Sequence, residues 1–300
     1  MQTRSALNTG IAAILLLSGI GSPLYAQVSG YPTPATTGVP AGTVLTNCGG
    51  SVTLSTAGQV ADKCLYTGDV EVTANNVIIR NSEIRGKIRR VNSGSFTLED
   101  STVGPTSGCS NADGQIQYSN YTARRVRLRN VADGFRVSGS NVLIEDSFVM
   151  LCSKPGDHSD GIQGYGGGTN VTVRHNTIDQ RQAPDATAPI FFADLSKAAT
   201  VTNNLIMGGG YVLRIHDDNN PDVGPWVITG NRIVQGAWMF GPVSTVNTQC
   251  TASSMTWSDN RLVTIDSNYN VLTTGSVVSC TGGTSGPNPP APPTNLRIIP

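Results

Sequence analysis

An eight-residue phrase with one pattern of apolar and polar positions recurs along most of the chain. Its first, third and last positions are apolar, and polar residues lie before the last one, as in VTVRHNTI (Val171 to Ile178). Alternation with a period of two, followed by Asn, Asp or Gly, is typical of a strand that runs into a turn. The phrase also begins at six other positions, and a degenerate copy begins at Val126: Val77, Phe96, Val142, Ala199, Trp226 and Met255.

The spacing of these phrases predicts a solenoid. Their starts recur after 16 to 30 residues, mostly 27 to 30, which is a repeat period. The three-and-four spacing of a helical solenoid is absent, and a sandwich or barrel would not need the same phrase in each unit. We therefore predict an all-β fold, a right-handed parallel β-helix of about eight coils with an N-terminal cap formed by residues 31 to 70.

The sixth position of the phrase predicts a ladder of stacked side chains. Equivalent positions on successive coils lie about 4.8 Å apart, and amides both donate and accept hydrogen bonds. The four asparagines are therefore expected to satisfy the backbone of one internal bend. In chain order this position holds Ser82, Ser101, Val131, Ser147, Asn176, Asn204, Asn231 and Asn260.

The two ends of the chain differ from the repeats. Residues 1–26 have a positive start, a short apolar core from Ile11 to Ile20 and a small residue, Ala26, before the expected cleavage point, as in a signal peptide. A membrane anchor would need a longer apolar run. The β-helix domain is expected over 27–284. Residues 285–300 form a proline-rich linker and a stub that resembles the first strand of a fibronectin type III module.

Composition narrows the compartment and the partners. Lys plus Arg and Asp plus Glu are 20 each, so no basic excess points to nucleic acid or a membrane surface. Six cysteines after a signal peptide favour three disulfides, and none has zinc-site spacing. The signal peptide predicts a secreted, extracellular or periplasmic protein, which we expect to be a monomer. Sequence proximity and the repeat predict these disulfide pairs: Cys48–Cys64, Cys109–Cys152 and Cys250–Cys280.

Candidate chemistry lies in the strands that precede the phrases. ADGFRV and SDGIQG place Asp133 and Asp160 27 residues apart, close to one coil, so the two aspartates are expected to stack. Alternation then directs one row of side chains outward from consecutive coils, with two histidines near its edge and a lysine on a loop above it. The row is Arg136, Gln163, Phe191 and Arg214, and the neighbours are His158, His216, Lys154 and Asp194.

This arrangement suits an extended sugar polymer. Arginines bind carboxylates, sugars pack on aromatic faces, and two adjacent carboxylates raise one pKa of the pair. A calcium ion bound by Asp133 and Asp160 is the alternative and the one cofactor that the sequence leaves open. Each Asp-Gly pair is also common as a plain turn, Lys154 as a solvated charge, and His175, within the phrase, is expected to be structural.

Several stretches resemble secreted bacterial right-handed parallel β-helix proteins: TGVPAGTVLT, VTANNVIIRNSEI, ADGFRV, HSDGIQ and VRHNTID. The fold is similar to that of pectate lyases, polygalacturonases and alginate epimerases. HSDGIQ is similar to the Asn-Thr-Asp-Gly motif of polygalacturonases, which implies a catalytic acid at Asp160. The Asp-Asp pair of those enzymes is replaced by PIFFAD, with Asp194 alone. RIH at Arg214 to His216 resembles their Arg-Ile-Lys.

Together these features predict an enzyme acting on an extended polysaccharide. The first hypothesis is a lyase that cleaves a uronate polymer by β-elimination, with Arg136 and Arg214 on the carboxylate, or one of them as the base, and His158 and Asp160 as acid and base. The second is a hydrolase that uses Asp133, Asp160 and Asp194. The third is a glycan-binding or surface protein without catalysis.

Overall fold

The computed structural model describes residues 30–111, 113–166, 168–183, 186–193, 199–216, 225–246, 250, 255–282 and 284–285. Within these, the side chains of residues 193, 216, 246, 284 and 285 are not described. The predicted signal peptide lies outside the described residues, as do Asp194 and all of the predicted linker except the backbone of residue 285. No helix of the described part is long and apolar enough to cross a membrane.

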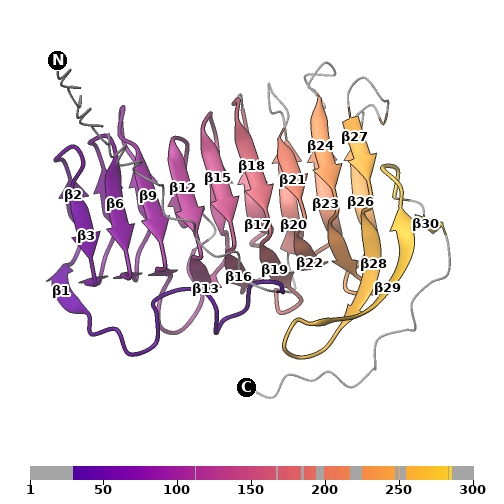
Figure 1. The fold of residues 1–300 in the computed structure, drawn as a ribbon, viewed down its shortest axis with the longest axis horizontal. Coiled ribbons are helices and arrows are strands. Elements are labelled where there is room, and N and C mark those ends of the chain that lie inside the picture. Colours follow the sequence, from indigo (N-terminus) through magenta and orange to yellow (C-terminus); the bar gives the residue numbers. More distant parts are fainter. Residues whose placement is uncertain are drawn as a thin grey trace, which may run out of the picture.

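The protein is a parallel β-helix in which each coil contributes one strand to each of three sheets (Figure 1). Sheet A contains β1 (Thr46–Gly49), β4 (Cys64–Tyr66), β7 (Glu83–Ile84), β10 (Thr102–Val103), β13 (Arg127–Val131), β16 (Phe148–Leu151), β19 (Thr177–Gln180), β22 (Leu205–Gly208), β25 (Arg232–Val234), β28 (Arg261–Ile265), β29 (Val271–Val278) and β30 (Thr284–Ser285). Its last two strands, β29 and β30, are antiparallel.

The other two sheets are parallel throughout. Sheet B contains β2 (Val52–Leu54), β5 (Val70–Val72), β8 (Ile88–Arg90), β11 (Ile116–Gln117), β14 (Phe135–Val137), β17 (Ser159–Gly164), β20 (Ala186–Ala193), β23 (Tyr211–His216) and β26 (Gly241–Val246). Sheet C contains β3 (Val60–Asp62), β6 (Val77–Arg80), β9 (Phe96–Glu99), β12 (Tyr121–Arg124), β15 (Val142–Glu145), β18 (Val171–Arg174), β21 (Thr200–Thr202), β24 (Trp226–Thr229) and β27 (Met255–Ser258).

The all-β parallel helix is confirmed, with about nine coils where eight were expected. The extra coil is the first one. Its strand β3 pairs with β6, and the backbone N–H of Cys64 donates to Ser82 Oγ, 3.0 Å away. Cys64 therefore occupies the sixth position of a phrase that lacks the usual Asn, Ser or Gly, which hid this coil in the sequence.

The degenerate copy that was placed at Val126 is wrong in register. Strand β12 begins at Tyr121, which pairs with Phe96 on one side and Val142 on the other. The phrase in this coil is YTARRVRL, so Val126 and not Val131 holds the sixth position, and its N–H donates to Ser147 Oγ. Arginines at the fourth and fifth positions disguised the copy, because a turn of Asn, Asp or Gly was expected there.

The fifth position of the phrase has a left-handed backbone in every coil. Its φ values run from 48° to 70°, a region that Gly, Asn and Asp enter at the lowest cost. This one residue turns the chain from sheet C into sheet A, which explains the polar group in the middle of each phrase. The residues are Lys63, Asn81, Asp100, Arg125, Asp146, His175, Asn203, Gly230 and Asp259.

The asparagine ladder at the sixth position is confirmed. The side-chain oxygen of Asn204 accepts from both the backbone N–H and the Nδ2 of Asn176, at 3.0 Å each. Asn204 in turn donates to Asn231 Oδ1 and to the carbonyl of Val173. Asn231 and Asn260 repeat the pattern. All four side chains are buried, so the ladder satisfies the interior bend between sheets C and A.

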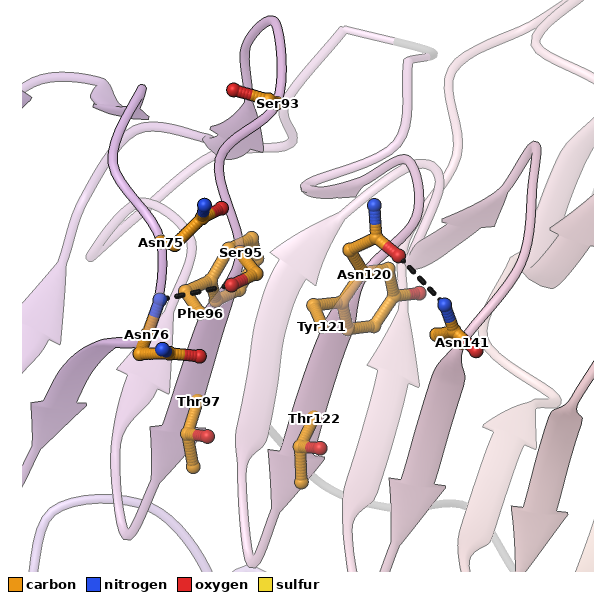
Figure 2. Close-up of a pocket in the computed structure, with 10 residues that line it drawn as sticks. All are labelled: Asn75, Asn76, Ser93, Ser95, Phe96, Thr97, Asn120, Tyr121, Thr122 and Asn141. Atoms are coloured by element: carbon orange, nitrogen blue, oxygen red, sulfur yellow. Dashed lines mark hydrogen bonds between the residues drawn. The ribbon is translucent and has the colours of Figure 1, made fainter. Parts of the chain in front are cut away.

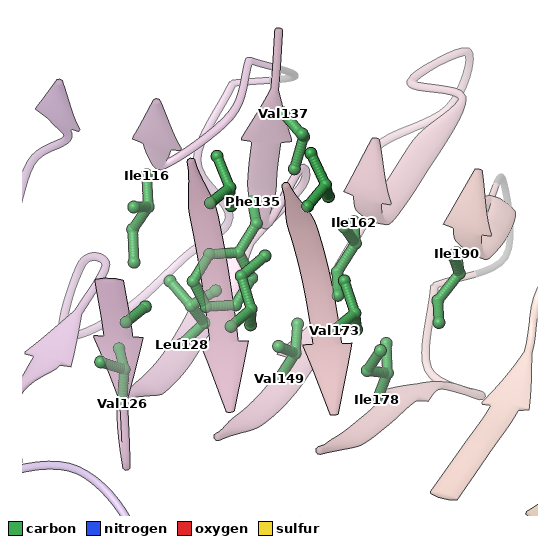
Figure 3. Close-up of a cluster of buried hydrophobic side chains, with 14 of the residues drawn as sticks. Ile116, Val126, Leu128, Phe135, Val137, Val149, Ile162, Val173, Ile178 and Ile190 are labelled. Carbon is green, nitrogen blue, oxygen red and sulfur yellow. The ribbon is translucent and has the colours of Figure 1, made fainter. Parts of the chain in front are cut away.

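Apolar side chains from all three sheets fill the interior (Figure 3). Phe135 of β14, Ile162 of β17 and Ile190 of β20 are inward residues of sheet B with exposed fractions of 1% or less. They lie in register along successive strands, so each packs on its equivalent in the next coil. The inward residues determine which side chains of sheet B point outward, because successive residues of a strand point to opposite faces of the sheet.

The first part of the described chain has two segments that lie in different places. Strands β1, β2 and β3 form the first coil, at the end where the sequence predicted a cap. Residues 30–45 instead run along the outside of the coils. The hydroxyl of Tyr31 donates to Asn203 Oδ1, and the N–H of Gly38 donates to the carbonyl of Arg125.

All three predicted disulfides are present: Cys48–Cys64, Cys109–Cys152 and Cys250–Cys280. The first joins neighbouring strands of sheet A, and the second joins two loops beside sheet B. Three disulfides indicate an oxidising, extracytoplasmic environment.

Candidate functional site

Asp133 and Asp160 stack on consecutive coils at the start of β14 and within β17. The N–H of Asp160 donates to Asp133 Oδ1 at 2.9 Å, and the N–H of Ala188 donates to Asp160 Oδ1 at 3.0 Å. Each carboxylate thus caps the backbone of the next coil. The exposed fractions of Asp133 and Asp160 are 6% and 1%.

The glycine of each Asp-Gly pair has a packing role. A Cβ on Gly134 would lie 2.2 Å from the carbonyl oxygen of Gly161, and one on Gly161 would lie 2.5 Å from the carbonyl oxygen of Pro189. Only glycine allows the coils to approach this closely. The two motifs therefore stack on each other where the chain enters sheet B, with Asp160 and Gly161 inside β17 and Asp133 and Gly134 directly before β14.

Burial and mutual repulsion perturb the two carboxyl groups. Loss of solvation raises the pKa of Asp160 well above its ordinary range, and the charge of Asp133 raises it further. Burial also raises the pKa of Asp133, although the N–H of Asp160 and the charge of Arg136 act against this. The pair therefore resists full ionisation.

Outside the aspartates, a row of outward side chains crosses sheet B in register. Arg136 pairs with Gln163, Gln163 with Phe191, and Phe191 with Arg214. The residue one coil before Arg136 is Gln117, because Ile116 pairs with Phe135. We call Gln117, Arg136, Gln163, Phe191 and Arg214 the sheet B row. At about 4.8 Å per coil it spans roughly 19 Å.

Two aromatic rings hold the arginines of this row. The guanidinium of Arg136 lies 5.5 Å from the ring centroid of Tyr165, and that of Arg214 lies 5.0 Å from the ring centroid of Phe191. The two rings meet edge to face, with centroids 6.1 Å apart. Tyr165 is 39% exposed, whereas Phe191 is buried, so Tyr165 joins the cluster to solvent.

Gln163 connects the aspartates to the tyrosine. Its Nε2 donates to Asp160 Oδ2 at 2.8 Å and to the hydroxyl of Tyr165 at 3.3 Å. Burial, followed by the charge of Asp160, raises the pKa of Tyr165. Protonation at Asp160 is therefore linked to the state of the exposed phenol.

Three buried polar atoms of the row have no hydrogen-bond partner among the described residues: Gln117 Oε1, Arg136 Nε and Gln163 Oε1. They lie on three consecutive coils. Buried polar groups in native proteins are nearly always paired, so three neighbouring exceptions point to a partner from outside the chain. One donor flanked by two acceptors matches a ligand that carries both hydroxyl and carboxylate groups.

The remaining predicted residues lie apart from this cluster or outside the described part. His158 is exposed on the loop before β17, five residues before Gln163, which is roughly 16 Å along an extended strand. Lys154 is exposed, and its Nζ donates to Asn111 Oδ1. Only the backbone of His216 is described, and Asp194 is not described at all.

The predicted calcium site fits these residues poorly. Three of the four oxygens of Asp133 and Asp160 already accept N–H donors. Calcium needs six to eight oxygen ligands. No group of three or more His, Cys, Asp or Glu side chains in the described residues is placed to hold a metal ion.

Sequence reasoning missed Tyr165 and Gln117. Tyr165 stands in GYGGG, outside the repeated phrases and the strand alignments, and Gln117 stands in a coil whose phrase was placed out of register. If the phrase is started at Tyr121, QIQ in the strand before it aligns with GFR, and Gln117 lies beside Arg136.

The chain matches no known family model. No curated protein and no solved structure matches it either. The parallel β-helix is common to carbohydrate-active enzymes. Because one fold serves many functions, the fold alone does not assign a function to this protein, and the side chains of the sheet B row and its neighbours must do so.

Proposed function

We propose that the protein is a secreted polysaccharide lyase of the pectate lyase-like superfamily, which holds a uronate polymer across sheet B and cleaves it by β-elimination. The observation that carries this proposal is the set of three unpartnered polar atoms on consecutive coils, next to two arginines and one exposed tyrosine. An extended polymer is favoured over a small ligand because the row crosses five coils.

The side chains of the row supply the contacts that such a polymer needs. Arg136 would bind a uronate carboxylate through its guanidinium, which neutralises the charge. Gln117 Oε1 and Gln163 Oε1 would accept from sugar hydroxyls on either side. Tyr165 offers an exposed ring for the sugar face, and Arg214 lies beyond Phe191 for a second carboxylate.

Tyr165 is the group that we assign to proton transfer. In β-elimination a base takes the proton α to the carboxylate, the bond to the leaving oxygen breaks, a carbon–carbon double bond forms, and the leaving oxygen gains a proton. The ionised phenol would take the first proton, and the resulting phenol would give it to the leaving oxygen. The enzyme then returns to its starting state without consuming water.

The raised pKa of Tyr165 gives this mechanism a pH dependence. The active form is the phenolate, which is scarce at neutral pH when the pKa lies above its ordinary value. Turnover should therefore rise with pH, about tenfold per pH unit, until the phenol ionises.

Hydrolysis has less support. Asp133 and Asp160 are almost fully buried, and their oxygens cap backbone N–H groups of the next coil. A hydrolase would need two carboxyl groups that face the sugar. A glycan-binding protein without catalysis would use the same row, and only the loss of turnover in a folded variant separates the two.

The test is near-ultraviolet absorbance, which detects the unsaturated uronate, with pectate, alginate and glucuronan as substrates. The wild-type protein would be compared with Tyr165→Phe, with Tyr118→Phe as the matched control. Tyr118 is also exposed and directly follows strand β11 of sheet B. We expect one polymer to give rising absorbance, a loss of at least about 100-fold in kcat for Tyr165→Phe, and little change for Tyr118→Phe.

A flat trace on all three polymers, with the wild-type protein folded, would overturn the lyase proposal. A reducing-sugar assay on the same samples would then reveal hydrolysis. Binding without any product would leave the glycan-binding function.

A further inference from the structure

A second candidate site lies on the outer face of sheet C, away from the sheet B row. Two adjoining grooves, with volumes of about 480 and 380 Å³, share Thr122 and Asn141. Figure 2 shows the residues that line the larger one. We call the two together the sheet C trough. Its lining runs across the coils from Asn75 to Arg174.

Threonines recur along the floor of the trough, interrupted by Leu143 of β15. Thr97 of β9 pairs with Thr122 of β12, and Thr172 of β18 occupies the same position two coils further on. All three are outward residues of intermediate exposure. Their hydroxyls therefore recur at about 4.8 Å or multiples of it, along the axis of the helix.

A second ladder of asparagines forms the rim. Asn141 Nδ2 donates to Asn120 Oδ1 at 3.0 Å, and Asn170 Nδ2 donates to Asn141 Oδ1 at 3.2 Å. An amide has two N–H donors and two acceptor sites, so Asn141 keeps one of each beyond the ladder. Unlike the buried ladder, this one faces solvent, since Asn141 and Asn170 are exposed.

The trough carries no uncompensated charge in its lining. The residues around the larger groove are all uncharged. The smaller groove includes Arg174, whose Nε donates to Glu145 Oε2 at 2.6 Å, and Glu145 also pairs with Arg124. The sheet B row differs, because there the two guanidinium groups lie over aromatic rings.

We propose that the sheet C trough binds a neutral polysaccharide chain that lies along the helix axis. Each coil of the trough offers at least one hydroxyl or amide group, in a repeat close to the length of one pyranose residue, which matches sugar hydroxyls that both donate and accept. An acidic polymer would find no free cation in the described lining of the larger groove. The proposal is independent of the reaction on sheet B.

The test is affinity gel electrophoresis in gels that contain hydroxyethyl cellulose, xylan, galactomannan or polygalacturonate. Thr122→Arg places a long charged side chain on the floor of the trough. Thr256→Arg is the matched control, since Thr256 holds the same position of the phrase in β27, outside both grooves. Arg136→Gln separates the sheet B row, and circular dichroism checks that each variant is folded.

We expect at least one neutral polymer to retard the wild-type protein. Thr122→Arg should weaken that binding tenfold or more, while Thr256→Arg and Arg136→Gln should leave it unchanged. If Thr122→Arg does not fold, Asn141→Ala, at an exposed residue, should still weaken the binding severalfold. Absence of retardation by every neutral polymer would overturn the proposal, as would retardation that Thr122→Arg and Asn141→Ala leave intact or that Arg136→Gln abolishes.

Discussion

Two stacks of side chains in this protein make the same kind of hydrogen bond, but one stack is neutral and the other is acidic. In the asparagine ladder between sheets C and A, and in the aspartate pair of sheet B, a side-chain oxygen accepts the backbone N–H of the neighbouring coil. The amide of Asn204 also donates, so each ladder amide satisfies its neighbour. The carboxylates of Asp133 and Asp160 only accept, and burial opposes their charge.

The asparagine ladder and the aspartate pair therefore respond differently to pH. A neutral ladder closes its own hydrogen bonds and adds stability at any ordinary pH. The aspartate pair gains or loses a proton inside the fold. Gln163 donates to both Asp160 and Tyr165 and so links this titration to the phenol at the surface. The unpartnered polar atoms of the sheet B row lie beside the aspartate pair.

The largest effect is expected from cutting the asparagine ladder. Asn204→Ala removes four buried hydrogen bonds: it leaves the N–H of Asn176 unpaired and takes one bond each from Asn176 Nδ2, the carbonyl of Val173 and Asn231 Oδ1. At about 2 kcal/mol for the unpaired N–H and about 1 kcal/mol for each of the other three bonds, the free energy of unfolding should fall by about 5 kcal/mol. Denaturant unfolding measures this. A loss under about 1 kcal/mol would mean that the ladder is incidental.

The next effect comes from the disulfide beside the aspartates. The loops that Cys109 and Cys152 join bond to the residues before each aspartate, because Ala132 N–H donates to Ser110 Oγ and Ser159 Oγ donates to the Cys152 carbonyl. Replacing both cysteines by serine should cost about 4 kcal/mol and let water reach the pair.

Cys48→Ser with Cys64→Ser is the control for this change. It should cost about 3 kcal/mol, because its loop is shorter, and should leave the titration of Asp160 as it is. Carbon-13 NMR of the aspartate carboxyl groups would follow this. Equal titration of Asp160 in both double variants would contradict the link.

A smaller effect, visible through its pH dependence, is expected for Asp160→Asn. A carboxyl whose pKa is raised by folding adds stability that is fully present below its ordinary pKa, about 3.9, and is lost as pH rises through the raised value. The variant lacks this loss. Its free energy of unfolding relative to wild type should therefore increase as pH rises from about 4.

Asp62→Asn provides the opposite sign. Its hydrogen bond from Asn81 lowers the pKa of Asp62, so that contribution is present above the ordinary pKa and is lost as pH falls through the lowered value. Unfolding curves across pH 3 to 8 compare the two variants. The same slope in both would refute the assignment of a raised pKa to Asp160.

The smallest effect is expected at the exposed ladder. Asn170→Gly removes one solvent-accessible bond to Asn141 and keeps a residue type that accepts the φ of 58°, so stability should change by no more than about 0.5 kcal/mol. The substitutions of Asn204 and Asn170 therefore compare the same residue type in a buried ladder and in an exposed one. A loss comparable to that of Asn204→Ala would show that burial is not the deciding factor.

The sequence predicted the fold through features that must repeat. The left-handed fifth position is present in each coil, and Ser or Asn holds the sixth position in every coil except those of Cys64 and Val126, so small polar residues recur there and reveal the architecture. The disulfide pairs were predictable from the closeness of the cysteines in the sequence and from the repeat length. The coil at Tyr121 escaped because Arg125 takes the left-handed conformation without the usual residue type.

The site was only partly predictable for a different reason. The stacking of Asp133 on Asp160 and the row from Arg136 to Arg214 followed from register. The approach of Tyr165 to Arg136 did not, because it depends on how the chain turns after β17. Nor did the burial of Gln163, which the sequence placed on an open face.

The most direct test of the site is side-chain NMR during titration with oligouronates. In nitrogen-15 spectra, the Arg136 Nε–H and the amides of Gln117 and Gln163 report the row whose buried atoms lack a partner. If the row is the ligand site, these signals shift together and saturate at the same concentration, while the Asn170 amide stays in place. If they remain unchanged at saturating oligouronates of every class tested, the sheet B row is not the site.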